Sequence, residues 1–261
     1  MAVSKVRVAA VQASYVLMDQ RATLERVAEL SAKAAEQGAQ LVVFPEVFVP
    51  GTPIWIDTRP IWDGDDDWYR LLVDNAVVIP GPAPARLADI ASEHSIWLVI
   101  GVEERDAHGA TIYNTVLYFS PEGQLVEKHR KLEPTGAERT VWGMGDGATL
   151  RVVPTPFARV GGLICWENYM PLARFHLYAQ GIDIWVAPTL AVGDGWIATL
   201  RHIAPREHDV RRWGEPGPAC RATSDRFPRS RQTRERRLPS RTRRLARAGQ
   251  YRHRRTDWRH H

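Results

Sequence analysis

Residues 19–46 read DQRATLERVAELSAKAAEQGAQLVVFPE, and within this stretch the hydrophobic spacing changes from that of a helix to that of a strand. In the first part, apolar side chains recur every three or four residues. This spacing predicts an amphipathic helix with Asp19 or Thr23 as its N-cap and Gly38 as its end. The four apolar residues before Pro45 then predict a short buried strand. A helix followed directly by such a strand is typical of α/β proteins.

The same alternation continues to about residue 204. Strands are predicted at 6–12, 96–102, 149–153, 159–164 and 182–187, a hairpin at 112–119 and 124–128, and helices after the proline-rich run 80–84, over 171–180 and over 194–204. We expect residues 6–12 to be buried and residues 50–80 to be loop-rich and aromatic, a length and composition that usually indicate a function or a lid. Repeated strand–helix units with an inserted hairpin indicate an α/β fold in which helices cover the faces of the sheets.

Length and composition exclude several classes of protein. The chain has 261 residues, 44% hydrophobic and 25% charged, which are ordinary values for one large globular domain or two modest ones. No apolar run reaches the roughly 18 residues of a membrane helix, and no secretory cleavage site follows the N-terminus. The two cysteines, Cys165 and Cys220, provide neither a disulfide framework nor a zinc cluster. We expect a soluble cytoplasmic protein with free thiols and no bound metal.

The charge is divided unevenly along the chain. Residues 205–261 contain 18 arginines, no lysine and six acidic residues, whereas residues 1–204 carry a net charge of −7. Apolar periodicity stops at Pro205, inside a predicted helix. An Arg-rich disordered tail could bind nucleic acid through phosphate contacts. The alternative, which the abrupt change and the lack of lysine favour, is a GC-rich coding region read out of frame, and the DNA sequence around codon 204 would decide between them.

Three residues that could carry chemistry follow predicted strands. Glu46 comes directly after an apolar strand, where ligands gather in α/β sheets, although it could equally be a surface glutamate. Lys131 ends the charged run 127–131, which by itself resembles a solvated strand end. Cys165 ends the strand at 159–164 and precedes a turn; a lone cysteine there is often an inert small hydrophobic residue. Taken alone, each of the three residues is therefore only weak evidence for a catalytic site.

Together the three residues form a coherent catalytic set. A cysteine attacks as its thiolate, and a neighbouring base or cation generates that thiolate. A carboxylate such as Glu46 can take the thiol proton and later activate water. An ammonium group such as Lys131 can stabilise negative charge that develops on a tetrahedral intermediate.

Three motifs in this order resemble those of the nitrilase superfamily of carbon–nitrogen hydrolases: FPE at 44–46, HRKLEPT at 129–135 and GLICWEN at 162–168. The resemblance extends over residues 6 to about 204. Within the superfamily, KLEPTGAER at 131–139 and CWENYMP at 165–171 resemble nitrilases more than amidases or carbamoylases. The resemblance implies an α/β fold of the αββα sandwich type, no cofactor, and a homodimer or larger homo-oligomer.

The resemblance also implies residue roles. Cys165 would be the nucleophile, Glu46 the base, Lys131 the stabilising cation, and Glu138 the second glutamate that helps to place the lysine. The implied reaction joins a nitrile to the cysteine as a thioimidate, releases ammonia to leave a thioester, and frees a carboxylic acid with two waters. An amidase or N-carbamoyl hydrolase of the same superfamily is the first alternative. An inactive product with a nucleic acid-binding tail is the second.

Supporting residues have weaker signals. The backbone N–H of Trp166 could donate to the developing negative charge. Glu167 could line the active-site wall or serve as a structural hydrogen-bonding residue. The tryptophans of residues 50–70 could line the substrate pocket or simply pack.

The C-terminus departs from the family. Members continue with further strands and an extension that crosses the dimer. We therefore interpret residues 1–204 as a hydrolase domain that is incomplete at its C-terminus, and residues 205–261 as an irregular Arg-rich tail that is disordered or out of frame. We therefore expect the 261-residue chain to be poorly soluble or weakly active. The preferred nitrile, the ratio of acid to amide and the assembly stay open from sequence.

Overall fold

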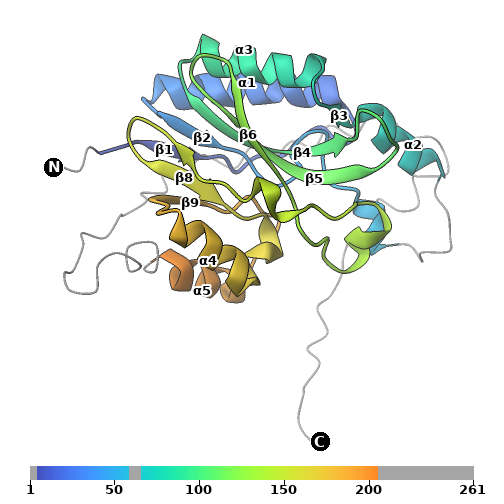
Figure 1. Ribbon diagram of the computed structural model, residues 1–261. Coiled ribbons are helices and arrows are strands. Elements are labelled where there is room, and N and C mark those ends of the chain that lie inside the picture. Colours follow the sequence, from blue (N-terminus) through green and yellow to red (C-terminus); the bar gives the residue numbers. More distant parts are fainter. Residues whose placement is uncertain (1–4, 59–65, 205–261) are drawn as a thin grey trace, which may run out of the picture. The chain divides into compact units, whose positions relative to one another are not determined.

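The computed structural model describes residues 5–58 and 66–204, which form four layers (Figure 1). Helices α1 (Gln20–Glu36) and α3 (Pro82–Glu93) cover one face of a larger β-sheet. A smaller sheet packs on its other face, and α4 (Pro171–Ala179) and α5 (Asp194–Ile203) form the opposite outer layer. The expected αββα sandwich is confirmed for this part of the chain.

The larger sheet is mixed. Its strands follow the order β1-β2-β4-β5-β6, with β3 paired to β4; β1, β2, β3 and β4 run parallel, whereas β5 and β6 continue antiparallel. Their bounds are β1 Val8–Ala10, β2 Leu41–Val43, β3 Val77–Val78, β4 Trp97–Arg105, β5 Ile112–Phe119 and β6 Leu125–Arg130. The long antiparallel pairing of β4 with β5 and β5 with β6 confirms the hairpin predicted from sequence.

The smaller sheet has the order β7-β8-β9. Its strands are β7 Val153–Pro154, β8 Arg159–Gly162 and β9 Ile184–Val186, with β7 antiparallel and β9 parallel to β8. Short helical segments complete the described chain: α2 Asp66–Asn75 and the 3₁₀ helices η1 Ile54–Asp57, η2 Gly136–Thr140, η3 Gly147–Thr149 and η4 Cys165–Tyr169. Among the helices of residues 5–58 and 66–204, none has the length and apolar character of a membrane-spanning segment.

Two apolar cores hold the layers together. Between the helices and the larger sheet, side chains of α1 and α3 pack on β2, β4 and β5: Leu24, Val27, Leu87, Ile90, Val42, Leu98, Ile100 and Leu117. Between the two sheets, residues of both sheets interdigitate: Leu41, Val99, Val116, Tyr118, Val153, Val160 and Val186. Burial of each large aliphatic side chain contributes about 1.5–3 kcal/mol, so these two cores fix the larger sheet on both of its faces.

Most predicted elements are present with small shifts in their ends. Helix α1 begins after Asp19, whose carboxylate accepts a hydrogen bond from the Ala22 N–H at 3.0 Å, as its predicted N-cap role requires. The helices predicted over 171–180 and 194–204 correspond to α4 and α5. The strand predicted at 182–187 is shorter and corresponds to β9.

Three predictions were wrong. The strand predicted at 6–12 is reduced to Val8–Ala10 and is largely exposed, because β1 has a partner strand on one side only. The strand predicted at 149–153 is mostly absent: Thr149 ends η3, and β7 begins at Val153. The predicted long loop at 50–80 contains α2, β3 and η1, so its aromatic residues belong partly to regular structure.

Gly101 lets the segment after β2 pack directly on β4. A Cβ at this position would lie 2.4 Å from the Val47 nitrogen and 2.5 Å from the Pro45 carbonyl oxygen. The Gly101 N–H also donates to that oxygen at 3.2 Å. Both neighbours are backbone atoms, so they cannot rotate away as a flexible side chain would. Gly101 therefore fixes where the chain places Glu46.

We expect Gly101→Ala to lower the free energy of unfolding by about 1–3 kcal/mol, because the added methyl group must displace backbone. Gly147→Ala is the matched control, since a Cβ there has no atom within 4 Å. Thermal or denaturant unfolding measures both variants. Equal stability of the two would contradict the close-packing role of Gly101.

Candidate active site

Glu46 lies in the segment after β2, with 2% of its surface exposed. Its Oε1 accepts hydrogen bonds from Asn114 Nδ2 and Lys131 Nζ, both at 2.8 Å. Its Oε2 accepts a longer bond from the Leu190 N–H, at 3.3 Å. The structure therefore places Glu46 in the interior with defined partners, and not on the surface as a solvated side chain.

Lys131 directly follows β6 and is 1% exposed. Its ammonium group lies between two carboxylates, 2.8 Å from Glu46 and 2.7 Å from Glu138. The ring centroid of Trp142 is 5.4 Å from Nζ. Burial lowers the pKa of Lys131, but the charges and hydrogen bonds of Glu46 and Glu138 outweigh burial and raise it overall. Lys131 is therefore a fixed cation at neutral pH.

Glu138 belongs to η2 and is the second carboxylate that contacts the Lys131 ammonium group. Its Oε2 accepts hydrogen bonds from Lys131 Nζ and, at 2.6 Å, from the N-cap N–H of Thr135. Burial raises the pKa of Glu138, with a further increase from the negative charge of Glu46, and Lys131 offsets only part of this rise. Glu138 and Glu46 therefore share the Lys131 ammonium group.

Cys165 stands where β8 passes into η4, and it is 7% exposed. Its φ of +48° lies in the left-handed region that side chains with a Cβ rarely adopt. The turn is anchored by the Cys165 N–H, which donates to the Pro188 carbonyl at 2.9 Å. Gly162 is the last residue of β8, and because it has no Cβ the strand can pack directly against the backbone of Val186 in β9. The sharp turn directs the sulfur inward, where Thr189 Oγ1 lies 3.2 Å from Sγ.

The thiol faces the Glu46 carboxyl. Burial, together with the charge of Glu46 and a hydrogen bond to it, raises the pKa of Cys165 to about 11, although Thr189 and Lys131 oppose the shift. The resting side chain is therefore a neutral thiol at pH 7. The three residues singled out from sequence lie together: Glu46 accepts a hydrogen bond from the ammonium group of Lys131, and its carboxyl is close enough to Cys165 to raise the pKa of the thiol. A proton can pass from sulfur to carboxylate as the sulfur attacks.

Glu167 joins the lysine-bearing segment to the cysteine-bearing segment. Its Oε1 accepts from the Leu132 N–H at 2.6 Å, and its Oε2 accepts from the Ile164 N–H at 2.7 Å. His129 Nε2 lies 3.2 Å from both oxygens, and its Nδ1 lies 3.1 Å from Thr149 Oγ1. Glu167 thus has the contacts of a structural hydrogen-bonding residue, the second of the two roles considered from sequence.

The tryptophans occupy different environments. The Trp166 side chain is 56% exposed and packs edge-on against Tyr169, so it lies at the surface whereas the Cys165 thiol is buried. Trp55 is buried, stacks on Trp68 with a centroid distance of 5.5 Å, and belongs to the same apolar cluster as Trp142. Trp62, also expected in this loop, lies outside the described residues.

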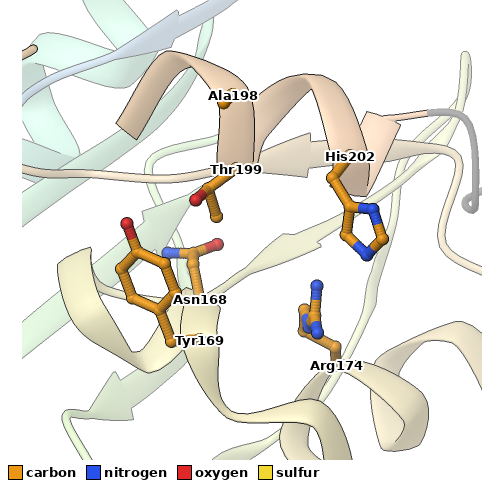
Figure 2. Close-up of a pocket in the computed structure, with 6 residues that line it drawn as sticks. All are labelled: Asn168, Tyr169, Arg174, Ala198, Thr199 and His202. Carbon is orange, nitrogen blue, oxygen red and sulfur yellow. The ribbon is translucent and has the colours of Figure 1, made fainter. Parts of the chain in front are cut away.

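A surface pocket of about 320 Å³ is formed by η4, α4 and α5. It is lined by Asn168, Tyr169, Arg174, Ala198, Thr199 and His202. Figure 2 shows Arg174 and His202 pointing toward each other across it. Asn168 connects the pocket to the turn, since its Nδ2 donates to the Cys165 carbonyl at 2.8 Å. The thiol is not among the lining residues, so we do not assign this pocket to the substrate.

The sequence analysis did not identify three polar residues that contact the site. Asn114, Thr189 and His129 all lie within or next to predicted strands, where polar residues usually face solvent. The only available signal was the antiparallel alignment of the predicted hairpin, which brings the end of β6 beside Asn114. For metal ligands, residues 5–58 and 66–204 contain no group of three or more His, Cys, Asp and Glu side chains arranged to hold an ion.

The αββα sandwich brings a glutamate, a lysine and a cysteine together in its interior. The sequence family described as carbon–nitrogen hydrolase matches residues 7–208. The chain belongs to this family.

The curated proteins with similar sequences include several named as nitrilases. The chain is 47% identical over 209 residues to an aliphatic nitrilase of Sinorhizobium fredii, covering 77% of this chain and 66% of that protein. It is 45% identical over 205 residues to a bifunctional nitrilase/nitrile hydratase of Nicotiana tabacum, covering 76% and 58%. The chain thus spans about three fifths of the length of the curated relatives it matches.

Solved structures agree on the fold. An amidase of Nesterenkonia superimposes with a TM-score of 0.61 at 23% identity, over 78% of this chain and 73% of that chain. At this identity the likeness concerns the arrangement of sheets and helices.

The neutral thiol leads to a testable pH dependence. In a Cys220→Ser background, we expect the rate at which iodoacetamide alkylates Cys165 to rise about tenfold per pH unit through pH 10, because only the thiolate reacts. N-acetylcysteine is the control and should level off above a pH of about 8.5. A plateau for Cys165 near pH 7 would show a resting thiolate and contradict the raised pKa.

Proposed function

We propose that this protein hydrolyses an organic nitrile to a carboxylic acid and ammonia, with Cys165 as nucleophile, Glu46 as base and Lys131 as stabilising cation. The observation that carries the proposal is that one buried carboxyl accepts a hydrogen bond from the ammonium group at 2.8 Å and lies near enough to the thiol to raise the pKa of Cys165. The nitrilase names of the curated relatives support the choice of a nitrile as substrate.

The first step forms a bond between sulfur and carbon. As Cys165 attacks the nitrile carbon, its proton passes to Glu46, and negative charge develops on the nitrile nitrogen. Lys131 stabilises this charge, and Glu46 then passes the proton it took from sulfur to the nitrogen, which gives a neutral thioimidate and an ionised Glu46. Because the thiol is neutral at rest, proton transfer to Glu46 has to accompany the attack.

Two waters complete the reaction. Glu46, again ionised, takes a proton from a water that adds to the thioimidate carbon, and the tetrahedral intermediate then expels ammonia to leave a thioester. A second water adds in the same way and releases the carboxylic acid and the Cys165 thiol. If the tetrahedral intermediate expels sulfur in place of ammonia, the product is an amide.

The remaining roles follow from contacts. Glu138 positions Lys131, and Glu167 ties together the segments that carry the lysine and the cysteine. We propose the backbone N–H of Trp166 as a further donor to the developing charge, since it follows the nucleophile directly. The inward tryptophan Trp55 contributes to the apolar wall near Lys131 through its cluster with Trp142.

Domain extent and cellular location are also proposals. We propose that the hydrolase domain ends near residue 204; the family match, which ends at residue 208, supports this boundary. The Arg-rich residues 205–261 lie outside the described part of the chain. A catalytic thiol has to stay reduced, which favours a cytoplasmic location.

We further propose that the protein forms homo-oligomers through its η4–α4–α5 layer. This layer and the segment just before α5 expose several large apolar side chains: Trp166 at 56%, Leu172 at 82%, Phe175 at 62%, Val192 at 90% and Ile197 at 45% exposure. Exposed apolar surface of this kind marks protein interfaces.

The reaction is tested by measuring ammonia released from a panel of aliphatic, aromatic and arylaceto-nitriles and from the matched amides. We expect turnover of at least one nitrile and its loss, by a factor of about 10⁴ or more, in Cys165→Ala, because no other group can form the covalent intermediate. The variant Glu133→Gln, at an exposed surface position, is the control.

Two outcomes would contradict the proposal. Amides hydrolysed much faster than every nitrile would make the protein an amidase. Nitrile hydrolysis that survives in Cys165→Ala would remove the nucleophile assignment.

The oligomer is tested by light scattering after size-exclusion chromatography. We expect Leu172→Asp combined with Phe175→Asp to lower the molar mass, because a charge in a buried apolar contact is costly. The double variant Arg26→Asp/Lys33→Asp on α1 is the control. An unchanged mass for the first variant would contradict the proposed interface.

A further inference from the structure

Glu103 is a buried carboxyl that the proposed mechanism does not use. It lies in β4 and is 0% exposed. Its Oε2 accepts a hydrogen bond from Trp142 Nε1 at 2.5 Å, whereas its Oε1 is buried without a partner. Such an oxygen costs free energy unless something satisfies it. An interior carboxyl with one oxygen unmatched therefore requires an explanation.

A second buried acceptor without a partner stands opposite. In the pairing of β4 with β5, Glu103 is aligned with Asn114, so their side chains leave the sheet on the same face. Asn114 is 1% exposed, and its Nδ2 donates to Glu46 at 2.8 Å, but its Oδ1 has no donor. Both oxygens are acceptors, so neither can satisfy the other unless a proton lies between them.

We propose that Glu103 is a neutral carboxylic acid that donates its proton in a hydrogen bond to Asn114 Oδ1 and so fixes the amide that donates to Glu46. A single proton satisfies both unmatched oxygens. It also determines the orientation of the Asn114 amide: Oδ1 faces the acid, and Nδ2 faces Glu46. Glu103 is thus a positioning residue, which acts on the base through Asn114 and rests on the role proposed for Glu46.

The charges around Glu103 favour the neutral form. Burial raises its pKa well above the ordinary value; the Trp142 hydrogen bond opposes this, while the charges of Glu46 and Glu138 add to it more than Lys131 removes. An ionised Glu103 would be a third carboxylate near a single ammonium group. A neutral Glu103 lets Lys131 remain bound to the two carboxylates that contact it.

The adjacent Glu104 provides the contrast. Successive residues of a strand face opposite sides, and Glu104 is met there by Lys128 at 2.5 Å, Arg130 at 2.7 Å and Thr115 at 2.8 Å. Burial raises the pKa of Glu104, but these hydrogen bonds outweigh it, so the pKa is lowered overall. Glu104 is the ionised control for a neutral Glu103.

The protonation state is tested by the pH dependence of unfolding. A carboxyl whose pKa is raised in the folded state loses stability as pH increases above its unfolded pKa of about 4.3. Glutamine does not titrate, so the Tm of Glu103→Gln relative to the natural chain should increase between a pH of about 5 and about 8. Glu104→Gln should instead have a lower Tm than the natural chain at neutral pH. If Glu103→Gln behaves like Glu104→Gln, or if its Tm difference does not change with pH, Glu103 is ionised and the proposal is wrong.

The positioning role is tested by kinetics on a nitrile substrate. Glutamine can accept from Trp142 and donate to Asn114, so Glu103→Gln should keep kcat within about twofold and leave the pH profile of kcat/KM unchanged. Glu103→Leu lacks the donor and should lower kcat roughly tenfold at similar KM. Full activity of Glu103→Leu, or a shifted profile in Glu103→Gln, overturns the role. Absence of nitrile turnover in every variant, the natural chain included, refutes the proposed function, while the unfolding measurements still decide the state of Glu103.

Discussion

The Lys131 ammonium group, held between the carboxylates of Glu46 and Glu138, is the interaction on which the site depends. Each partner comes from a different segment, so the ion pairs join the end of β2, the end of β6 and the η2 turn. A buried charge without partners is strongly destabilising, and removal of either carboxylate would leave the lysine poorly compensated. The same arrangement that stabilises the lysine also brings the Glu46 carboxyl to the cysteine.

Neighbouring glutamates show how the sheet separates two electrostatic environments. Glu103 faces the site, where carboxylates are already in excess, and Glu104 faces two cations on the other side of the same strand. The residue type is the same, but the alternation of the strand decides which set of charges each side chain meets. A one-residue change of register would exchange these environments, so the pairing of β4 with β5 matters for the chemistry as well as for the fold.

The sequence was informative where a local signal determines structure. Helix α1, the β5–β6 hairpin and the αββα layering follow from capping residues, alternation and the resemblance of three motifs. The exposure of β1 could not be predicted, because it depends on β1 being the edge strand of the sheet, and strand order is set by long-range pairing. Asn114, Thr189 and His129 escaped notice for a related reason: their partners are 68, 24 and 38 residues away in sequence, and no local pattern encodes such contacts.

The left-handed backbone of Cys165 has a consequence for how this fold tolerates change. A side chain held at φ +48° stores strain that surrounding contacts must offset. Glycine adopts this conformation without penalty, so a variant with glycine at this position would relax the turn while abolishing the sulfur. Selection for heat resistance alone would therefore drive the chain away from its own chemistry, and only selection for turnover would retain the cysteine.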